Sequence, residues 1–239
     1  MSQAPSPPAP LTSAALTRHE ALLIALTFAA GVVDAESYLG LGQIFTANMT
    51  GNVVFLALAV GERNLPTALH SAVALLGFCV GAVAAGRVLV RPRPAGEWPA
   101  EVNWLLWGEL AFLVAFAALW ISGSADSESG LLFLLIVLSS VAMGLQNAAA
   151  RHLAVPGLTT TVVTTALTGL MVDLPALGIS GSAQRRAVWA VTVLFAGAAV
   201  GATLIVYARP IAPLVTVTVV AGVALTAYRY FGRPPHHGQ

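Results

Sequence analysis

Long apolar segments, repeated along almost the whole chain, constrain this sequence more than any other feature. They recur from residue 20 to residue 231 and measure about 20 residues, the length that an α-helix needs to cross the hydrocarbon core of a bilayer. Only 9% of the 239 residues are Asp, Glu, Lys or Arg, against roughly 25% in a typical soluble domain. The sequence therefore excludes a soluble enzyme and a nucleic-acid-binding protein, and it predicts a polytopic helical membrane protein.

We expect an all-α transmembrane bundle of about eight spans, or six to eight, each of about 20 residues. Residues 1–17 are rich in Pro and are expected to form a disordered tail. Residues 18–232 then form a single transmembrane domain, and residues 233–239 a polar tail. A re-entrant or broken conformation of the second and sixth spans, which are rich in Thr, Asn and Gly, would leave six full crossings. The predicted spans cover residues 20–41, 44–61, 67–90, 103–122, 130–151, 158–177, 187–208 and 211–231.

The arginines bear on orientation, because basic residues collect on the cytoplasmic side of a membrane protein. All 11 basic residues are Arg. With eight spans they divide six to five between the two sides. Without Arg87 and Arg151, which lie within spans, the division is six to three. This favours both termini on the cytoplasmic side.

Polar landmarks recur in the same order in the two halves of the chain. The segment Gly31–Ala35 of the first span matches Gly144–Ala148 of the fifth. We interpret residues 18–122 and 130–232 as two repeats of four spans. An even number of spans in each repeat makes the two repeats parallel, whereas three in each would invert them.

Small residues four positions apart mark the third and seventh spans. Such glycines let helix backbones approach closely in lipid, so we expect them to serve helix packing. These glycines are Gly77, Gly81, Gly197 and Gly201.

Ionisable groups inside a span need an explanation, because each one is costly in hydrocarbon unless it is paired or hydrated. Asp34 shares a helical face with Tyr38, and its counterpart in the second half is Asn147, which is followed at the same spacing by Arg151. If the halves face each other, Asp34 and Arg151 meet near the axis. That pair is either a structural salt bridge, or a gated pair or proton site that a substrate or ion disrupts. Glu109, with apolar neighbours, either snorkels to the interface or faces a cavity.

The richest polar stretch opens the predicted second span. Thr46 and Thr50 form one row of a helix there, and Asn48 and Asn52 form another. Together with the matching row in the predicted sixth span, these residues indicate either interhelical hydrogen bonds or a polar cavity at a repeat interface, where transporters bind their substrates. Hydroxyl and amide groups suit a neutral or zwitterionic solute, or a cation. The counterparts in the sixth span are Thr160 and Thr164.

Other chemistry finds little support in the sequence. Cys79 is the single cysteine, which excludes an internal disulfide and a multi-cysteine metal site. The five histidines lack helical metal-pair spacing, and no nucleophile–base set or phosphate loop is present. We therefore expect no metal, no cofactor and no enzymatic activity.

A family resemblance rests on the two motifs. The residues from Gly31 to Asn52 resemble the signature of the YoaK-like family of bacterial multi-pass membrane proteins, and Ala142–Ala148 resembles that family's second motif. The resemblance extends from about residue 20 to residue 230. It implies a multi-pass protein of the bacterial cytoplasmic membrane and no catalytic residues.

Two functions compete on this sequence. The first is a small-solute secondary transporter or permease with a polar site between the repeat halves. The second is a membrane scaffold or sensor whose polar residues only lock the helices together. Asp34 and the polar rows favour the first, and a homo-oligomer in the bilayer remains compatible with either.

Overall fold

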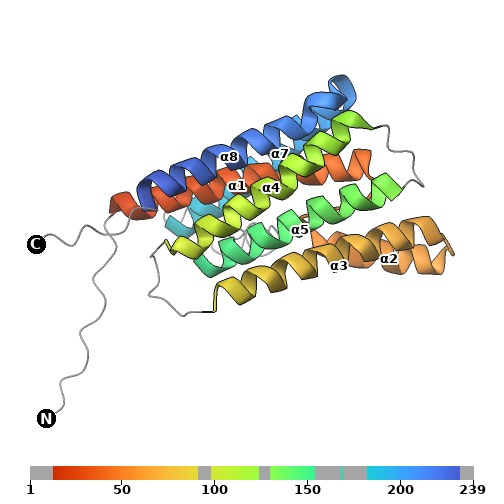
Figure 1. Ribbon diagram of the computed structural model, residues 1–239, viewed down its shortest axis with the longest axis horizontal. Coiled ribbons are helices and arrows are strands. Elements are labelled where there is room, and N and C mark those ends of the chain that lie inside the picture. Colours follow the sequence, from red (N-terminus) through yellow and green to blue (C-terminus); the bar gives the residue numbers. More distant parts are fainter. Residues whose placement is uncertain (1–12, 91–97, 124–129, 154–167, 169–181, 232–239) are drawn as a thin grey trace, which may run out of the picture.

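Seven α-helices and one short 3-10 turn make up the part of the chain that the structure describes (Figure 1). This computed structural model describes residues 13–90, 98–123, 130–153, 168 and 182–231. Helix α1 begins at Ser13, so residues 13–17 of the expected tail are helical. The elements are α1 (Ser13–Gly40), α2 (Met49–Gly61), α3 (Leu65–Val88), α4 (Ala100–Ser122), α5 (Gly130–Leu153), α7 (Ser182–Tyr207), the 3-10 turn η1 (Arg209–Ile211) and α8 (Ala212–Phe231).

Six of the described helical segments are long and apolar enough to cross a membrane. The sequence-based prediction of a multi-pass all-α protein is therefore confirmed. The second predicted span, 44–61, is wrong as a full crossing: α2 has 13 residues, a length of about 20 Å, whereas the hydrocarbon core is about 30 Å thick. The sixth predicted span, 158–177, lies outside the described residues apart from residue 168. The six spanning segments are Arg18–Gly40, Leu65–Val88, Ala100–Ser122, Gly130–Leu153, Arg186–Tyr207 and Arg209–Phe231.

The start of α1 and the end of α8 lie side by side at one end of the bundle, on the left in Figure 1. Arg18 stands 4.6 Å from the ring centre of Tyr230, and the rings of His19 and Phe231 are 4.9 Å apart. An even number of crossings returns the chain to the side on which it started. We call this end of the bundle the terminal end.

Two pairs of parallel helices form the close contacts of the bundle, α1 with α7 and α3 with α5. A Cβ atom added to Gly31 of α1 would overlap the carbonyl oxygen of Leu194 on α7 and lie 2.9 Å from the nitrogen of Ala198. A Cβ atom added to Gly144 of α5 would overlap the carbonyl oxygen of Phe78 on α3 and lie 2.9 Å from the nitrogen of Ala82. The two contacts have the same geometry.

The glycines of α3 and α7 meet their partners in a matching way. A Cβ atom on Gly81 would overlap the carbonyl oxygen of Val141, and one on Gly197 that of Phe28. Val141 and Phe28 each precede the α5 or α1 glycine by three residues. Gly77 faces Ser140, and Gly201 faces Val32. By these contacts, Gly81 of α3 corresponds to Gly197 of α7. By its place in the small-residue motif, Gly77 would be the residue that corresponds to Gly197.

Parallel repeats, as the sequence suggested, are contradicted by the directions of the helices. Helix α1 runs away from the terminal end, whereas α5, which carries the second motif, runs toward it (Figure 1). The reason is the incomplete second span. With α2 too short to cross, α1, α3 and α4 make three crossings before α5 begins, so α5 enters the membrane from the opposite side.

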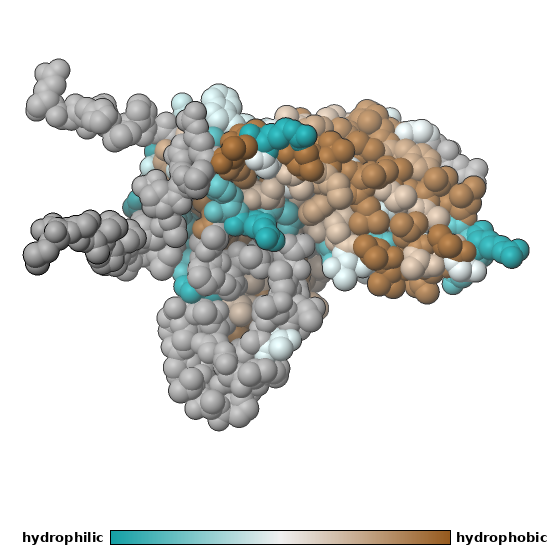
Figure 2. Space-filling model, turned by 90° about the horizontal axis from the view of Figure 1, so that it is seen from below, coloured by the Kyte–Doolittle hydropathy of each residue, from teal (hydrophilic) through white to brown (hydrophobic). Residues whose placement is uncertain are grey.

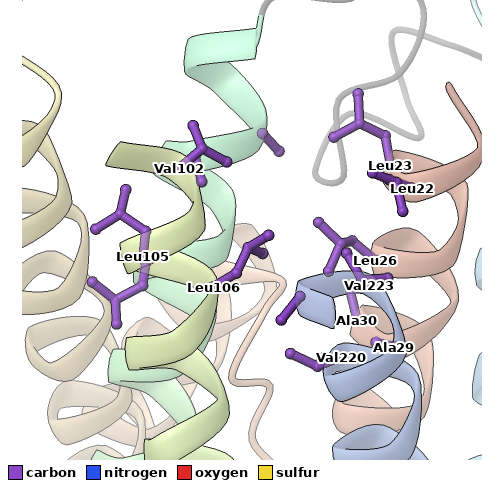
Figure 3. Packing of buried hydrophobic residues seen from close by; sticks show 14 of the residues in the cluster. Leu22, Leu23, Leu26, Ala29, Ala30, Val102, Leu105, Leu106, Val220 and Val223 are labelled. Carbon is purple, nitrogen blue, oxygen red and sulfur yellow. The ribbon is translucent and has the colours of Figure 1, made fainter. Parts of the chain in front are cut away.

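Apolar side chains fill the middle of the bundle and cover its outside. In Figure 3, Leu106 points from α4 toward the helices that carry Leu26 and Val223, and all three residues belong to one buried cluster. The face of the bundle in Figure 2 is largely apolar where it is coloured. Leu76 and Val80 of α3 are exposed on the outside of the bundle, as is Cys79 between them in the sequence.

Candidate functional site around the start of helix α2

A glycine-rich turn ends α1 and reverses the chain. Gly42 has φ +87° and Gln43 has φ 61°, the left-handed region that favours glycine. The backbone N–H of Gln43 donates to the carbonyl oxygen of Tyr38 at 3.1 Å, which closes the turn. A Cβ on Gly42 would lie 2.8 Å from Nδ1 of His70, so the turn also packs tightly against α3. The chain then runs back along α1 before α2 starts at Met49.

Asp34 holds this returning segment. Its Oδ1 atom accepts hydrogen bonds from the backbone N–H groups of Thr46, Ala47 and Asn48, at 3.2, 2.8 and 3.3 Å. Asn48 is the N-cap of α2, and its own side chain makes no capping bond. The first N–H groups of a helix carry a partial positive charge and lack partners within the helix. The Asp34 carboxylate therefore supplies from α1 the negative charge that the start of α2 needs.

Asn52 fixes the same segment from the other side. Its Oδ1 atom accepts the backbone N–H of Phe45 at 2.8 Å, and its amide group donates to the carbonyl oxygen of Phe45. Asn52 is fully buried. The ring of Phe45 stacks on Tyr38, with centroids 5.4 Å apart, and on Phe55, at 5.6 Å. One amide side chain and two rings thus determine the conformation of a segment without regular structure.

The start of α2 lies at mid-depth in the bundle. The hydroxyl groups of Thr46 and Ser139 are 2.8 Å apart and buried. Ser139 is the tenth residue of the 24-residue helix α5, so it lies near the centre of a spanning helix. Helix α2 then runs from this depth to the end of the bundle opposite the termini (Figure 1). It is a half-length helix that begins inside the membrane layer.

Several polar groups at the start of α2 are available to a ligand. The side chains of Asn48 and Thr50 are exposed, and Tyr38 is 38% exposed. Within the described part of the chain, Oδ2 of Asp34 accepts no hydrogen bond, although Oδ1 accepts three. A carboxylate oxygen, an amide and a hydroxyl can together coordinate a cation or hydrogen-bond a small polar solute.

Comparison with known proteins places this architecture in a family. The family model described as a protein of unknown function, DUF1275, matches residues 22–227. The chain belongs to the DUF1275 family. It is similar to the UPF0700 transmembrane protein YoaK of Bacillus subtilis (strain 168), with 39% identity over 153 residues. That alignment covers 64% of this chain and 66% of the relative, just under two thirds of its length. No solved structure matches the chain.

These findings confirm the resemblance seen in the sequence and the multi-pass membrane location of this DUF1275 protein. Other expectations are corrected by the geometry. Asp34 and Arg151 do not form an ion pair: Arg151 is exposed in the last turn of α5, at the terminal end, while Asp34 is bonded to the start of α2. Asn147 donates to the carbonyl oxygen of Met143 in its own helix. The antiparallel course of α1 and α5 separates the two motifs.

The two polar rows predicted for the second span are also wrong. Thr46 and Asn48 precede α2 and are not helical, so they form no row with Thr50 and Asn52. The competing hydrogen bonds of Asp34 and Asn52 explain why the helix starts at Met49. Thr160 and Thr164, the expected counterparts, lie outside the described residues.

Two buried polar residues near the site were missed as candidates in the sequence. Glu36 follows Asp34 by two residues in α1 and is only 1% exposed. Ser139, the partner of Thr46, is 1% exposed. The adjacent Ser139 and Ser140 in an otherwise apolar span were the available signal for a polar contact there.

The Thr46–Ser139 contact allows a direct test of the position of the loop. In a double-mutant cycle of Thr46→Val and Ser139→Ala, we expect a coupling energy of about 0.6 kcal/mol and at most about 1.7 kcal/mol, the range of interhelical hydrogen bonds in membranes. Thermal unfolding in detergent measures it. Thr203, which bonds the carbonyl oxygen of Ala199 in its own helix, provides the control: Thr203→Val should show no coupling to Ser139→Ala. Zero coupling for Thr46 as well would place the loop elsewhere.

Proposed function

We propose that this DUF1275 protein is a small-solute secondary transporter whose binding site lies at the start of α2. The observation that carries the proposal is a half-length helix that begins at mid-depth, with Asp34 bonded to the backbone N–H groups of the three residues immediately before it. The solute class is a small neutral or zwitterionic molecule or a cation, which would contact Oδ2 of Asp34 and the side chains of Asn48 and Thr50.

The physical reason is the cost of irregular backbone in lipid. Unpaired N–H and C=O groups are tolerated at membrane depth only where protein covers them or where they line a polar cavity. A protein that needed only a bundle could cross the membrane with a continuous helix. Broken helices whose ends point at the bilayer midplane are the common construction of transporter binding sites.

The movement follows from the arrangement of the helix pairs. We infer that the halves are inverted repeats, with α1, α3 and α4 related to α5, α7 and α8. The matching glycine contacts of α1 with α7 and of α3 with α5 support this relation. Each close pair combines helices of both halves and acts as one rigid body. Rocking of one pair against the other would open the site to each side in turn, as in other inverted-repeat transporters.

The proposed orientation places the terminal end in the cytoplasm. With six crossings, the arginines among the described residues divide six to two between the ends, an excess that the positive-inside rule assigns to the cytoplasm. The count with eight spans did not show this excess. It treated the second span as a full crossing, which assigns the connections that follow it to the opposite side of the membrane. Arg18, Arg87, Arg151, Arg185, Arg186 and Arg229 lie at the terminal end, and Arg63 and Arg209 at the other.

A binding screen tests the proposal. Purified protein in detergent is heated with single amino acids, sugars, polyols and monovalent cations, and its unfolding temperature is recorded. We expect at least one compound to raise that temperature for wild type and for the control Thr203→Val, but not for Asp34→Asn or Asn48→Ala. The same compound should enter proteoliposomes that contain wild type. If it stabilises all four proteins equally, the site is wrong.

The competing function is a scaffold without transport. It is favoured by Thr46 and Asn52, whose side chains are satisfied within the protein. Under it, no compound shifts the unfolding temperature, and Asp34→Asn changes stability only.

A further inference from the structure

A second polar feature lies in the core, away from the start of α2. The buried face of α4 contains Val102, Leu106, Leu113 and Phe116, and with Glu109 between Leu106 and Leu113 these positions are spaced by three or four residues. Glu109 occupies the same stripe. It is 0% exposed, and neither of its carboxylate oxygens has a hydrogen-bond partner in the described part of the chain. A glutamate thus stands where the pattern calls for leucine.

The surroundings of Glu109 are apolar. Leu106, one turn before it, points toward the helices that carry Leu26 and Val223 (Figure 3). On the other side, α4 approaches α5 where a Cβ on Gly108 would lie 3.7 Å from Cδ1 of Leu145. Glu109 therefore does not reach the interface by snorkelling, one of the two alternatives that its sequence allowed. It lies inside the bundle.

No described cation is placed to neutralise a Glu109 carboxylate. The titratable groups of α5 and α8 are in their last turns, and Arg209 of η1 contacts Trp120, eleven residues further along α4. Across the core, the stretch of α1 between Leu26 and Ala30 has none. The groups concerned are Arg151 and His152 of α5, Tyr228, Arg229 and Tyr230 of α8, and, toward the ends of α1, Arg18, His19, Glu20, Asp34, Glu36 and Tyr38.

An isolated carboxylate in such a place is far more costly than a neutral carboxylic acid. A protonated Glu109 also becomes a donor, and the neighbouring helix α5 carries a buried acceptor without a donor. Gln146 follows Leu145 on α5, is 0% exposed, and donates to the carbonyl oxygen of Leu26 at 3.0 Å. Its Oε1 atom accepts no hydrogen bond from the described residues. A bound proton would remove the isolated charge from the core.

We propose that Glu109 is a proton-binding site, protonated in the resting protein, and that it carries the coupling proton of transport. The proton leaves the carboxyl group when water reaches the core, which regenerates the carboxylate, and another proton from the opposite side restores the acid. The binding of the proton stands on the Glu109 environment alone. Its role in coupling rests on the proposed transport function.

Infrared difference spectra between neutral and alkaline pH test proton binding. Wild type in detergent should lose the C=O stretching band of a neutral carboxyl group as the pH rises. Glu109→Gln should lack one component of that change. The exposed Glu62→Gln is the control that keeps the whole change, and Glu36→Gln, which removes another buried carboxyl group, should keep the component that Glu109→Gln loses. A spectrum of Glu109→Gln identical to that of wild type would overturn the proposal.

The pH dependence of stability tests the same claim without spectroscopy. The native state would hold a proton that an unfolded glutamate releases above about pH 4.3, so wild-type stability should decrease as the pH rises from there. Glu109→Gln, a neutral isostere, should unfold a few degrees higher than wild type at neutral pH. Unfolding at a lower temperature than wild type would indicate a charged, paired carboxylate and contradict the proposal.

A separate measurement tests the coupling role of Glu109, and it distinguishes a failure of coupling from a failure of proton binding or of the transporter function. A compound found in the binding screen is added to wild type in weakly buffered solution with a pH dye. Proton uptake or release by wild type and its absence in Glu109→Gln support coupling. An equal pH change in both overturns coupling but not proton binding. The absence of any stabilising compound contradicts the transporter function and leaves the infrared result standing.

Discussion

Replacing Asp34 with alanine is expected to lower the free energy of unfolding by about 2 kcal/mol, the scale of hydrogen bonds to a charged group and of a lost helix cap. The change removes the one oxygen that accepts the N–H groups of Thr46, Ala47 and Asn48. Those groups then remain unpaired at membrane depth, where water is scarce. Thermal or denaturant unfolding in detergent measures the loss.

The conservative variant separates the two roles of Asp34. Asp34→Asn keeps an oxygen that can accept the same N–H groups but loses the charge at the start of α2, so we expect roughly half of the alanine penalty, about 1 kcal/mol. Glu62→Gln, at the exposed end of α2, should be neutral. If Asp34→Ala were as stable as Glu62→Gln, the hydrogen bonds to α2 would have no energetic role.

Alanine at Gly31 or at Gly144 is expected to destabilise the protein by about 1–3 kcal/mol, the cost of overpacking a closely packed contact. The added Cβ atom meets backbone atoms of the partner helix: those of Leu194 for Gly31 and those of Phe78 for Gly144. Backbone cannot move aside as the end of a flexible side chain can, so the whole helix must shift. Unfolding in detergent reports the change in stability.

Matched glycines provide the control for this prediction. Gly86 lies on α3 and Gly222 on α8, and a Cβ on either would meet nothing within 4 Å. Alanine there should be neutral or slightly stabilising, because alanine favours a helix more than glycine does. Because the two tight contacts match, the penalties at Gly31 and Gly144 should agree within about 0.5 kcal/mol. Unequal penalties would argue against inverted repeats.

The spanning helices could be predicted from the sequence because hydrophobic length is a local property. A run of about 20 apolar residues has few alternatives in a bilayer, and the predicted spans 67–90 and 130–151 lie within two residues of α3 and α5 at every end. The importance of Asp34 was also predictable, because an ionisable residue within a span needs a partner.

The partners themselves could not be predicted. Asp34 bonds to backbone groups, and backbone N–H groups leave no trace in residue types. The predicted Thr and Asn rows assumed helical periodicity, but the segment from Phe45 to Asn48 is held outside the helix by Asp34 and Asn52, contacts that depend on the turn at Gly42. Because α2 was predicted as a full crossing, the expected direction of α5 was the reverse of the observed one. The error in this one segment therefore led to the wrong prediction that the two halves are parallel.

The chain carries its only thiol on the surface that lipid covers. Cys79 lies on the exposed face of α3, and a thiol surrounded by hydrocarbon is out of reach of charged, water-soluble reagents. Wild-type protein should therefore not react with such reagents. The reaction of such a reagent with Asn48→Cys or Thr50→Cys can therefore be measured without first removing Cys79. Its rate from each side of the membrane reports the solvent access to the start of α2.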